Sequence, residues 1–359
     1  MSIDAVIKVS SLKAWWQLVI QDQTRARVMR FAVGVTIAVA LAYGINWPLA
    51  FLLPVLSSVI LALPLPMPSL QAGIRNMFST VKAFALGLVF SLFFLQYPVA
   101  YILMLGFVLF HLYYYLNRGG SFWLTLMSML ALLMLPMMAN SNEGLAIGFS
   151  IGFVYTGCLT VIMVWVSYLL VPDPQSAKFP QSPGFQAGYS PLAAQTALKS
   201  TLIIFPMASL FIIFNLSDYL LVMIFSALFI LKPELNAGKE AGRNSLISTL
   251  LGGACAAVFY WLIVVVPEYH FYIVLMLLTT LLFAMNIFSG KPTAKYYGSA
   301  FIALLILVNG SMSEGADFSG LLINRILLII LATSYIVAAI KVLDSYWPEK
   351  NINQLSASD

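Results

Sequence analysis

The stretch Pro68-Ser69-Leu70-Gln71-Ala72-Gly73, with Arg75-Asn76 just behind it, returns later in the chain as Pro233-Glu234-Leu235-Asn236-Ala237-Gly238, with Arg243-Asn244 behind it. In each copy the Arg-Asn pair opens a long apolar run. A repeated pattern of this length indicates an internal duplication, which determines the architecture before any single motif does.

The similarity extends upstream of the quoted stretch. Each copy begins with a basic residue and an apolar run, and continues with a polar break and a serine in the next run. These matching positions, which share one offset, are Arg30 and Lys199, Asn46 and Asn215, and Ser57 and Ser226. The copies cover Arg30 to about Leu95 and Lys199 to about Val266, and we predict a duplicated membrane unit.

The composition fits one class of protein. Hydrophobic residues make up 61% of the 359-residue chain and charged residues 9%, whereas a soluble domain carries about 25% charged residues. Only a polytopic membrane protein, with the lipid bilayer as its surroundings, fits these values. The net charge of +5 does not indicate a nucleic-acid partner, because the basic residues stand at the ends of apolar runs. Cys158 and Cys255 lie inside such runs and are expected to pack there rather than to form a disulfide or a metal site.

The apolar runs predict an all-α fold of about twelve transmembrane helices, with ten as the fallback count. The runs fall near 31–46, 49–65, 77–95, 98–116, 121–139, 146–171, 199–214, 219–231, 245–266, 271–288, 299–310 and 321–343. The first two runs of each half are short and contain prolines or a tight polar break. Bent or partly re-entrant helices are therefore expected there, provided that protein or water covers the freed backbone groups.

These runs divide the chain into five segments. Residues 1–28 have apolar residues at helical spacing with tryptophans among them, which predicts an amphipathic helix at the membrane interface or, equally, a cytosolic helix. Residues 29–171 form the first six-helix repeat and 199–345 the second. Between them lies a cytosolic linker, 172–198, rich in Pro, Gln, Ser and Gly, and residues 346–359 form a cytosolic tail.

The basic residues predict the orientation in the membrane. If both termini are cytoplasmic, nearly all Lys and Arg residues fall on the cytosolic side. The connections on the opposite side contain Glu and Asp but no Lys or Arg. Because six spans per half is an even number, the halves have the same orientation. We therefore predict two parallel repeats related by a pseudo-twofold axis along the membrane normal.

No catalytic or cofactor motif is present. The chain has no GxxxxGK[ST] loop, no HExxH, no Cys-His cluster and no GxSxG elbow, and it has two histidines. We therefore predict that the protein is not an enzyme and has no catalytic residue, cofactor or metal site.

Cationic residues at membrane depth are the candidates for substrate binding. Arg75 and Lys82 are seven residues apart and so share one helix face, while Arg75 and Arg243 occupy matching positions that each open a helix, where anions are favoured. Arg325 lies about one turn into the last run. The alternatives are that Lys82 extends to the interface, that Arg325 caps it, and that Arg75 and Arg243 serve as positive-inside anchors.

Three further residues complete the candidate binding set. His111 lies in the fourth run before three tyrosines and is expected either to contact a ligand or proton or to pack through a hydrogen bond. Ser57 and Ser226 either bind substrate or allow close helix approach. No Asp or Glu falls in the middle of a predicted span, so the inside-negative potential, rather than a buried carboxylate, is the expected drive for anion export.

The repeated unit resembles the fusaric-acid-resistance-like proteins, a group that includes bacterial aromatic carboxylic acid exporters. The resemblance rests on a basic residue before the first span, on Trp47-Pro48-Leu49-Ala50 at the start of the second, on Arg75 opening the third and on Arg325 in the last. It implies an efflux component of the Gram-negative inner membrane that works beside a periplasmic adaptor of the membrane-fusion type. The chain departs from the family in having only a short linker where many members carry a cytosolic domain.

Together these observations predict an inner-membrane efflux transporter that moves small organic anions, aromatic carboxylates in particular, out of the cytosol. Two alternatives stay open. One is a passive organic-anion channel, and the other is a non-transporting membrane scaffold for an envelope complex. Assembly into a homo-oligomer, the coupling ion and the identity of the substrate are not determined by the sequence.

Overall fold

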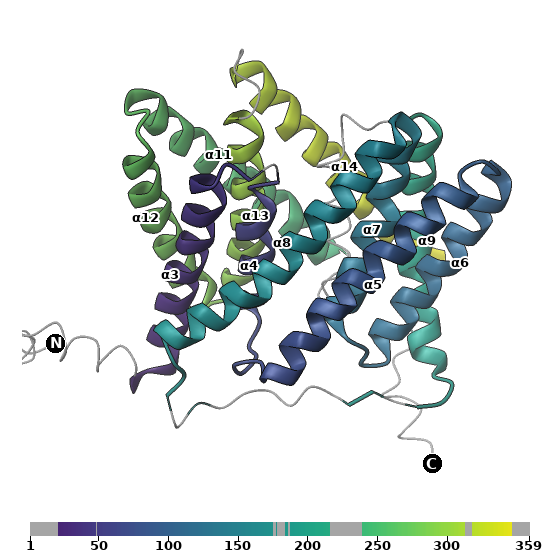
Figure 1. Cartoon of the computed structure of the whole chain (residues 1–359), viewed down its shortest axis with the longest axis horizontal. Coiled ribbons are helices and arrows are strands. Elements are labelled where there is room, and N and C mark those ends of the chain that lie inside the picture. The colour runs from purple at the N-terminus through teal and green to yellow at the C-terminus, as the bar shows by residue number, and fades with distance from the viewer. Residues whose placement is uncertain are drawn as a thin grey trace, which may run out of the picture.

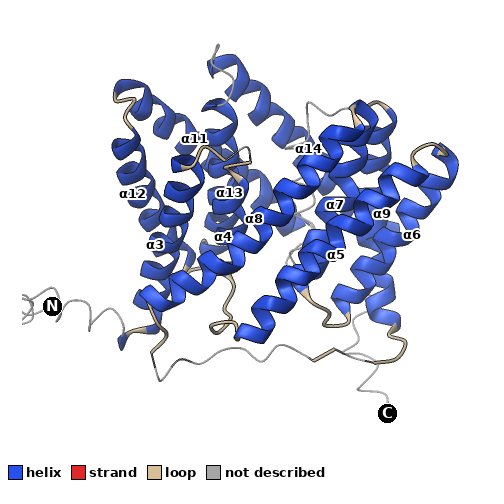
Figure 2. Cartoon of the chain, viewed as in Figure 1, coloured by secondary structure: helices blue, strands red, loops and turns tan. Residues whose placement is uncertain are grey.

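The computed structural model describes residues 21–47, 49–174, 177, 184–185, 187–215, 239–312 and 318–346. Figure 2 shows only helices and connecting loops in this part of the chain. The helices are α3 (Gln23–Gly44), α4 (Leu52–Ala62), α5 (Leu70–Phe94), α6 (Pro98–Asn117), α7 (Phe122–Ser141), α8 (Glu143–Leu170), α9 (Pro191–Ile213), α11 (Lys239–Val265), α12 (Tyr269–Ile287), α13 (Ala294–Met312) and α14 (Phe318–Tyr346).

The prediction of an all-α polytopic membrane protein is confirmed. Eight of the described helices are long and apolar enough to cross a bilayer. Each predicted run coincides with a described helix except 219–231, which lies outside the described residues. The proposed interfacial segment up to residue 20, most of the linker and the tail from residue 347 also lie outside them.

The first helix of each half begins well before its apolar run. The Asp22 carboxylate accepts a hydrogen bond from the Thr24 N–H at 2.9 Å, so α3 begins at Gln23. The Ser190 hydroxyl accepts from the Ala193 N–H, and α9 begins at residue 191. N-capping side chains of this kind satisfy the free donors of a first turn, and they extend both helices beyond the purely apolar part.

The two halves run in the same direction. In Figure 1, α3, α5, α7 and α9 begin at the lower end of the bundle, and α4, α6 and α8 return to it. We call this lower end the basic end, because the connections and first turns there carry Arg25, Arg27, Arg30, Arg75, Arg118, Lys291 and Lys295. The opposite end carries Asn46, Glu143 and Glu268.

Helix contacts repeat between the halves. In the first half α5 packs on α7 and α8, and in the second half α11 packs on α13 and α14. Across the junction, α3 packs against α12, and the reciprocal pair α9 and α6 packs in the same way. Figure 1 shows these two seams on opposite sides of the bundle. When two similar halves are related by a pseudo-twofold axis, each contact between them is expected to occur twice with the roles of the halves interchanged, as these two pairs do.

The polar breaks of the two repeats have the same backbone conformation. Asn46 follows α3 with a φ of 49°, and Asn215 follows α9 with a φ of 48°. Among the described residues, these two are the non-glycine positions with positive φ. Asparagine tolerates this left-handed conformation better than most residues, which explains why the same residue stands at both breaks.

Close approach of helices depends on small residues. Gly87 on α5 lies against Ala131 on α7, where an added Cβ would be 2.8 Å from the alanine Cβ. In the second half, Gly252 on α11 meets the backbone of Ala300 on α13. Small residues at such crossings allow the backbones to pack closely, which is the main source of helix association in lipid.

Helix α4 is too short to cross a bilayer by itself. Its 11 residues rise about 16 Å, roughly half of the hydrocarbon thickness. The segment 63–69 then returns to the basic end as an extended strand of chain with prolines at 64, 66 and 68. The Trp165 indole N–H donates to the Pro68 carbonyl at 3.0 Å, and the Tyr168 hydroxyl donates to the Leu65 carbonyl at 2.7 Å. The short α4 and the extended segment behind it agree with the predicted interruption of this run, and side chains cover two of the freed carbonyls.

The Gly87 crossing gives a first test. Gly87→Ala is expected to lower the free energy of unfolding by about 1–3 kcal/mol, because the methyl group overlaps Ala131 in a packed seam. The matched control is Gly148→Ala, since a Cβ at Gly148 on α8 meets nothing within 4 Å. Thermal unfolding of the purified protein in detergent measures both, and equal midpoints would contradict the packing described.

Candidate functional site

A cavity of about 1080 Å³ opens at the basic end between the two halves. Its walls come from α3, from the end of α4 with the extended segment behind it, from the beginning of α5, and from the α6–α7 connection. The second half contributes the end of α12 and the beginning of α13. The cavity therefore lies where the duplicated units meet, as the sequence predicts for a shared pathway.

The fixed charges in this cavity are positive. Arg75 on α5 and Lys295 on α13 line it, and the described lining residues include no Asp or Glu. Helix ends contribute partial charges of about half a unit each. The N-termini of α7 and α13 and the C-terminal ends of α4, α6 and α12 all border the cavity, so these partial charges roughly offset one another. The two side chains consequently determine the sign, and the cavity favours an anion.

The remaining walls are aromatic and hydroxylated. Phe31, Tyr115, Phe122 and Phe185 line the cavity, and Phe31 stacks at a tilt on Phe301 with ring centroids 5.5 Å apart. The serine hydroxyls at positions 58, 79 and 121 also face it. A mainly apolar wall with a small number of polar and charged groups is the usual composition of a small-molecule binding site.

A smaller cavity of about 190 Å³ lies behind the extended segment. Trp123, Val161 and Val164 give it apolar walls, and Asn76 and Thr160 supply polar groups. The described lining residues include no Lys, Arg, Asp or Glu. Its environment is therefore uncharged, in contrast to the larger cavity.

Among the predicted binding residues whose side chains the structure describes, Arg75 is the one that lines a cavity. Lys82 lies on the same face of α5, as the seven-residue spacing requires, but its side chain is exposed between Phe78 and Leu86 and lines neither cavity. His111 is exposed on α6, where its Nδ1 lies 2.8 Å from the Phe107 carbonyl oxygen. That contact favours packing over ligand binding.

On α4, the serine that lines the larger cavity is Ser58, one position after the predicted Ser57. Ser57 is fully buried, and its hydroxyl has no hydrogen-bond partner among the described residues. The neighbouring Ser58 lines the larger cavity and donates to the Val55 carbonyl at 2.8 Å. The roles assigned to the other predicted residues involve positions or side chains outside the described part of the structure, namely Ser226, Arg243 and Arg325.

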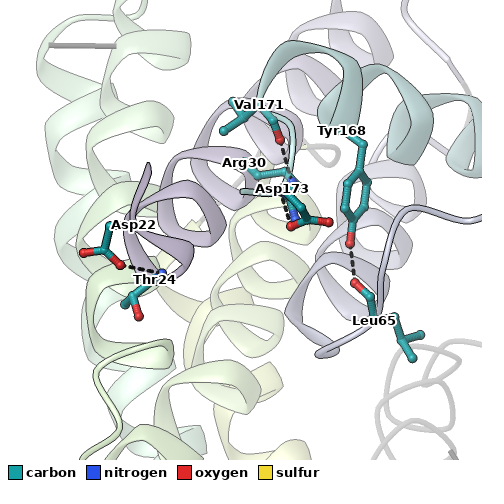
Figure 3. Close-up of polar contacts among 7 residues, drawn as sticks. All are labelled: Asp22, Thr24, Arg30, Leu65, Tyr168, Val171 and Asp173. Atoms are coloured by element: carbon teal, nitrogen blue, oxygen red, sulfur yellow. Dashed lines mark hydrogen bonds and ion pairs between the residues drawn. The ribbon is translucent and has the colours of Figure 1, made fainter. Parts of the chain in front are cut away.

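Arg30 forms a polar cluster that the sequence does not reveal as a site. Its side chain is 4% exposed. The Nε group donates to the Val171 carbonyl at 2.8 Å, and the guanidinium pairs with the Asp173 carboxylate at 2.6 Å. The guanidinium carbon lies 3.8 Å from the centroid of the Tyr168 ring. Figure 3 shows this cluster, which connects α3 to the end of α8.

The sequence feature that could have identified Arg30 is its position at the start of the first repeat copy. Lys199 occupies the matching position on α9 and is also buried. Lys295 carries no comparable signal, because its contribution depends on the packing of α13 against the first half. Sequence reasoning assigns both Arg30 and Lys295 to the cytosolic side without giving either a binding role.

The comparison with protein-family models gives a match in the first half of the chain. A family model described as "Protein of unknown function (DUF2955)" matches residues 27–167, which is less than half of the chain. The chain is thus similar to that family from α3 to near the end of α8. No curated protein and no solved structure matches. The resemblance to the fusaric-acid-resistance-like proteins stays a prediction.

The two arginine ion pairs on α3 give a second test. Arg30→Ala leaves Asp173 without its partner in a largely buried place and is expected to lower the free energy of unfolding by about 3 kcal/mol. Arg25→Ala removes an exposed pair with Asp22, whose side chains are 63% and 48% exposed, and is expected to cost about 0–1 kcal/mol. Thermal unfolding in detergent compares the two, and a larger loss for Arg25→Ala would refute the assignment.

Proposed function

We propose that this multi-pass membrane protein transports small organic anions, aromatic carboxylates in particular, out of the cytosol. The observation that carries the proposal is the cavity at the basic end, which both halves line and to which Arg75 and Lys295 contribute two positive charges. A carboxylate entering this cavity exchanges water for charge-assisted hydrogen bonds, which are stronger than those between neutral groups.

The dimensions suit such a substrate. Ligand cavities commonly measure about 300–1,000 Å³, and this one measures about 1080 Å³, so a one- or two-ring acid fits with accompanying water. Aromatic side chains favour offset or edge-to-face contacts with a substrate ring. Four aromatic side chains, Phe31, Tyr115, Phe122 and Phe185, provide such contacts here.

The proposed direction follows from the distribution of charge. The positive-inside rule assigns the basic end to the cytosol, so the cavity would collect anions from the cytosolic side. The inside-negative potential then favours outward movement by about 2.3 kcal/mol per charge per 100 mV. That energy corresponds to about a fiftyfold concentration ratio, so no buried carboxylate is needed for coupling.

The packing beyond the cavity favours a carrier over an open channel. The lining of the cavity reaches Leu124 on α7 and Ile302 on α13, and the next turns of both helices are buried. At the opposite end, the Tyr269 hydroxyl donates to the Ala40 carbonyl at 2.6 Å, which joins the halves there. A cavity closed at one end supports alternating access and saturable transport.

The Gram-negative inner membrane and the periplasmic adaptor follow from the family resemblance alone. The scaffold alternative predicts that neutralising the cavity cations leaves function intact. Transport measurements on cavity variants therefore separate it from the carrier.

Vesicle transport provides the third test. Purified protein in proteoliposomes is expected to move benzoate in response to a potassium-diffusion potential, with a rate that saturates. Arg75→Gln and Lys295→Gln are each expected to lower this rate about tenfold or more, because each removes a charged hydrogen-bond donor for the carboxylate.

The matched control is Lys82→Gln, which removes a charge from the same helix outside the cavity. This variant is expected to keep the wild-type rate. Equal losses in all three variants would point to a general effect of net charge. A wild-type rate that did not change when the potential was collapsed would exclude the proposed driving force.

A further inference from the structure

The larger and smaller cavities are separated by a thin wall. Leu63, Leu65, Ser121 and Phe122 line both of them. Two of these residues belong to the extended segment behind α4, and two to the first turn of α7 and its cap. The extended segment therefore forms part of the boundary between the two cavities.

The backbone of this segment makes few hydrogen bonds of its own. Prolines at positions 64, 66 and 68 carry no N–H. Within the segment, the Leu65 N–H donates to the Leu63 carbonyl at 2.9 Å. The Tyr168 hydroxyl attaches the segment to α8 through the Leu65 carbonyl at 2.7 Å. This bond acts at a residue that lines both cavities.

Tyr168 is itself held in one orientation. One face of its ring carries the Arg30 guanidinium at 3.8 Å, and that guanidinium is fixed by the Val171 carbonyl and the Asp173 carboxylate. Figure 3 shows the sequence of contacts from Arg30 through Tyr168 to Leu65. A buried cation over a ring contributes more than an exposed one, so the cluster orients the hydroxyl towards the wall.

We propose that Tyr168 is a specificity-determining residue that keeps the wall closed, and that the smaller cavity is an extension pocket for an uncharged, apolar part of a larger anion. The cationic cavity would hold the carboxylate, while the pocket formed by Trp123, Val161 and Val164 would accept a second ring once the wall moves. Arg30 acts through Tyr168 as a positioning residue. The identity of the substrate rests on the proposed function, but the role of Tyr168 in closing the wall does not.

The wall is tested by labelling a cysteine in the smaller cavity. Thr160→Cys is introduced after Cys158 and Cys255 are replaced by serine, and the probe is the uncharged reagent N-ethylmaleimide. Thr160 is fully buried and lines only the smaller cavity. Tyr168→Phe, which keeps the ring over Arg30 and loses the hydroxyl, is expected to raise the labelling rate about two- to tenfold, the effect of one neutral hydrogen bond.

Tyr155→Phe is the matched control, because Tyr155 lies on the same helix and is 62% exposed. If Tyr168→Phe labels no faster than this control, the wall is not held by Tyr168 and the proposal is overturned. Val161→Cys, which also lines the smaller cavity, provides a second reporter position if Thr160→Cys does not fold.

Transport tests the specificity itself. In the proteoliposome assay, Tyr168→Phe is expected to raise the ratio of 2-naphthoate to benzoate transport about two- to tenfold, while Tyr155→Phe keeps the wild-type ratio. Faster labelling with an unchanged ratio overturns the specificity role. If the wild type moves neither acid, the proposed function fails, and the labelling comparison alone then decides whether Tyr168 holds the wall.

Discussion

The structure depends on satisfying the backbone groups that are freed where α4 ends. Within the hydrocarbon layer an unpaired N–H or C=O costs several kcal/mol, so an interrupted helix survives only where protein covers it. The extended segment lacks N–H donors at its prolines, and the Trp165 and Tyr168 side chains donate to two of its carbonyls, those of Pro68 and Leu65. The same segment is a wall of both cavities. The contacts that satisfy these backbone groups therefore also fix a wall of the two cavities.

Duplication supplies a symmetric frame, but the cavity within it is asymmetric. The second residue of α7 is Trp123, whose indole N–H donates to the Asn76 carbonyl and the Thr80 hydroxyl. The second residue of α13 is Lys295, which lines the cavity. One half therefore contributes aromatic packing where the other contributes a charge. A duplicated pair can diverge in this way, because a single pathway between two halves needs only one set of binding groups.

The sequence predicts the fold well because the fold depends on local properties. Apolar runs set the helices, and the repeated asparagines mark the breaks at 46 and 215. The site is harder to predict, because helical spacing says which residues share a face but not what covers that face. Arg75 and Lys82 share one face of α5, yet of these two residues only Arg75 lines the larger cavity. The contribution of Lys295 depends on contacts between distant segments, which no local pattern contains.

The balance of charges in the larger cavity supports the proposed selection of an anion. The helix ends around it are of both kinds, and partial charges of about half a unit on each side roughly cancel. Two full positive charges then stand without a described carboxylate in the lining. A bound anion neutralises part of this charge before the apolar turns of α7 and α13 are crossed. A cation would be repelled by Arg75 and Lys295, and a neutral molecule would make no charge-assisted contact between two full charges, so neither gains what a carboxylate gains.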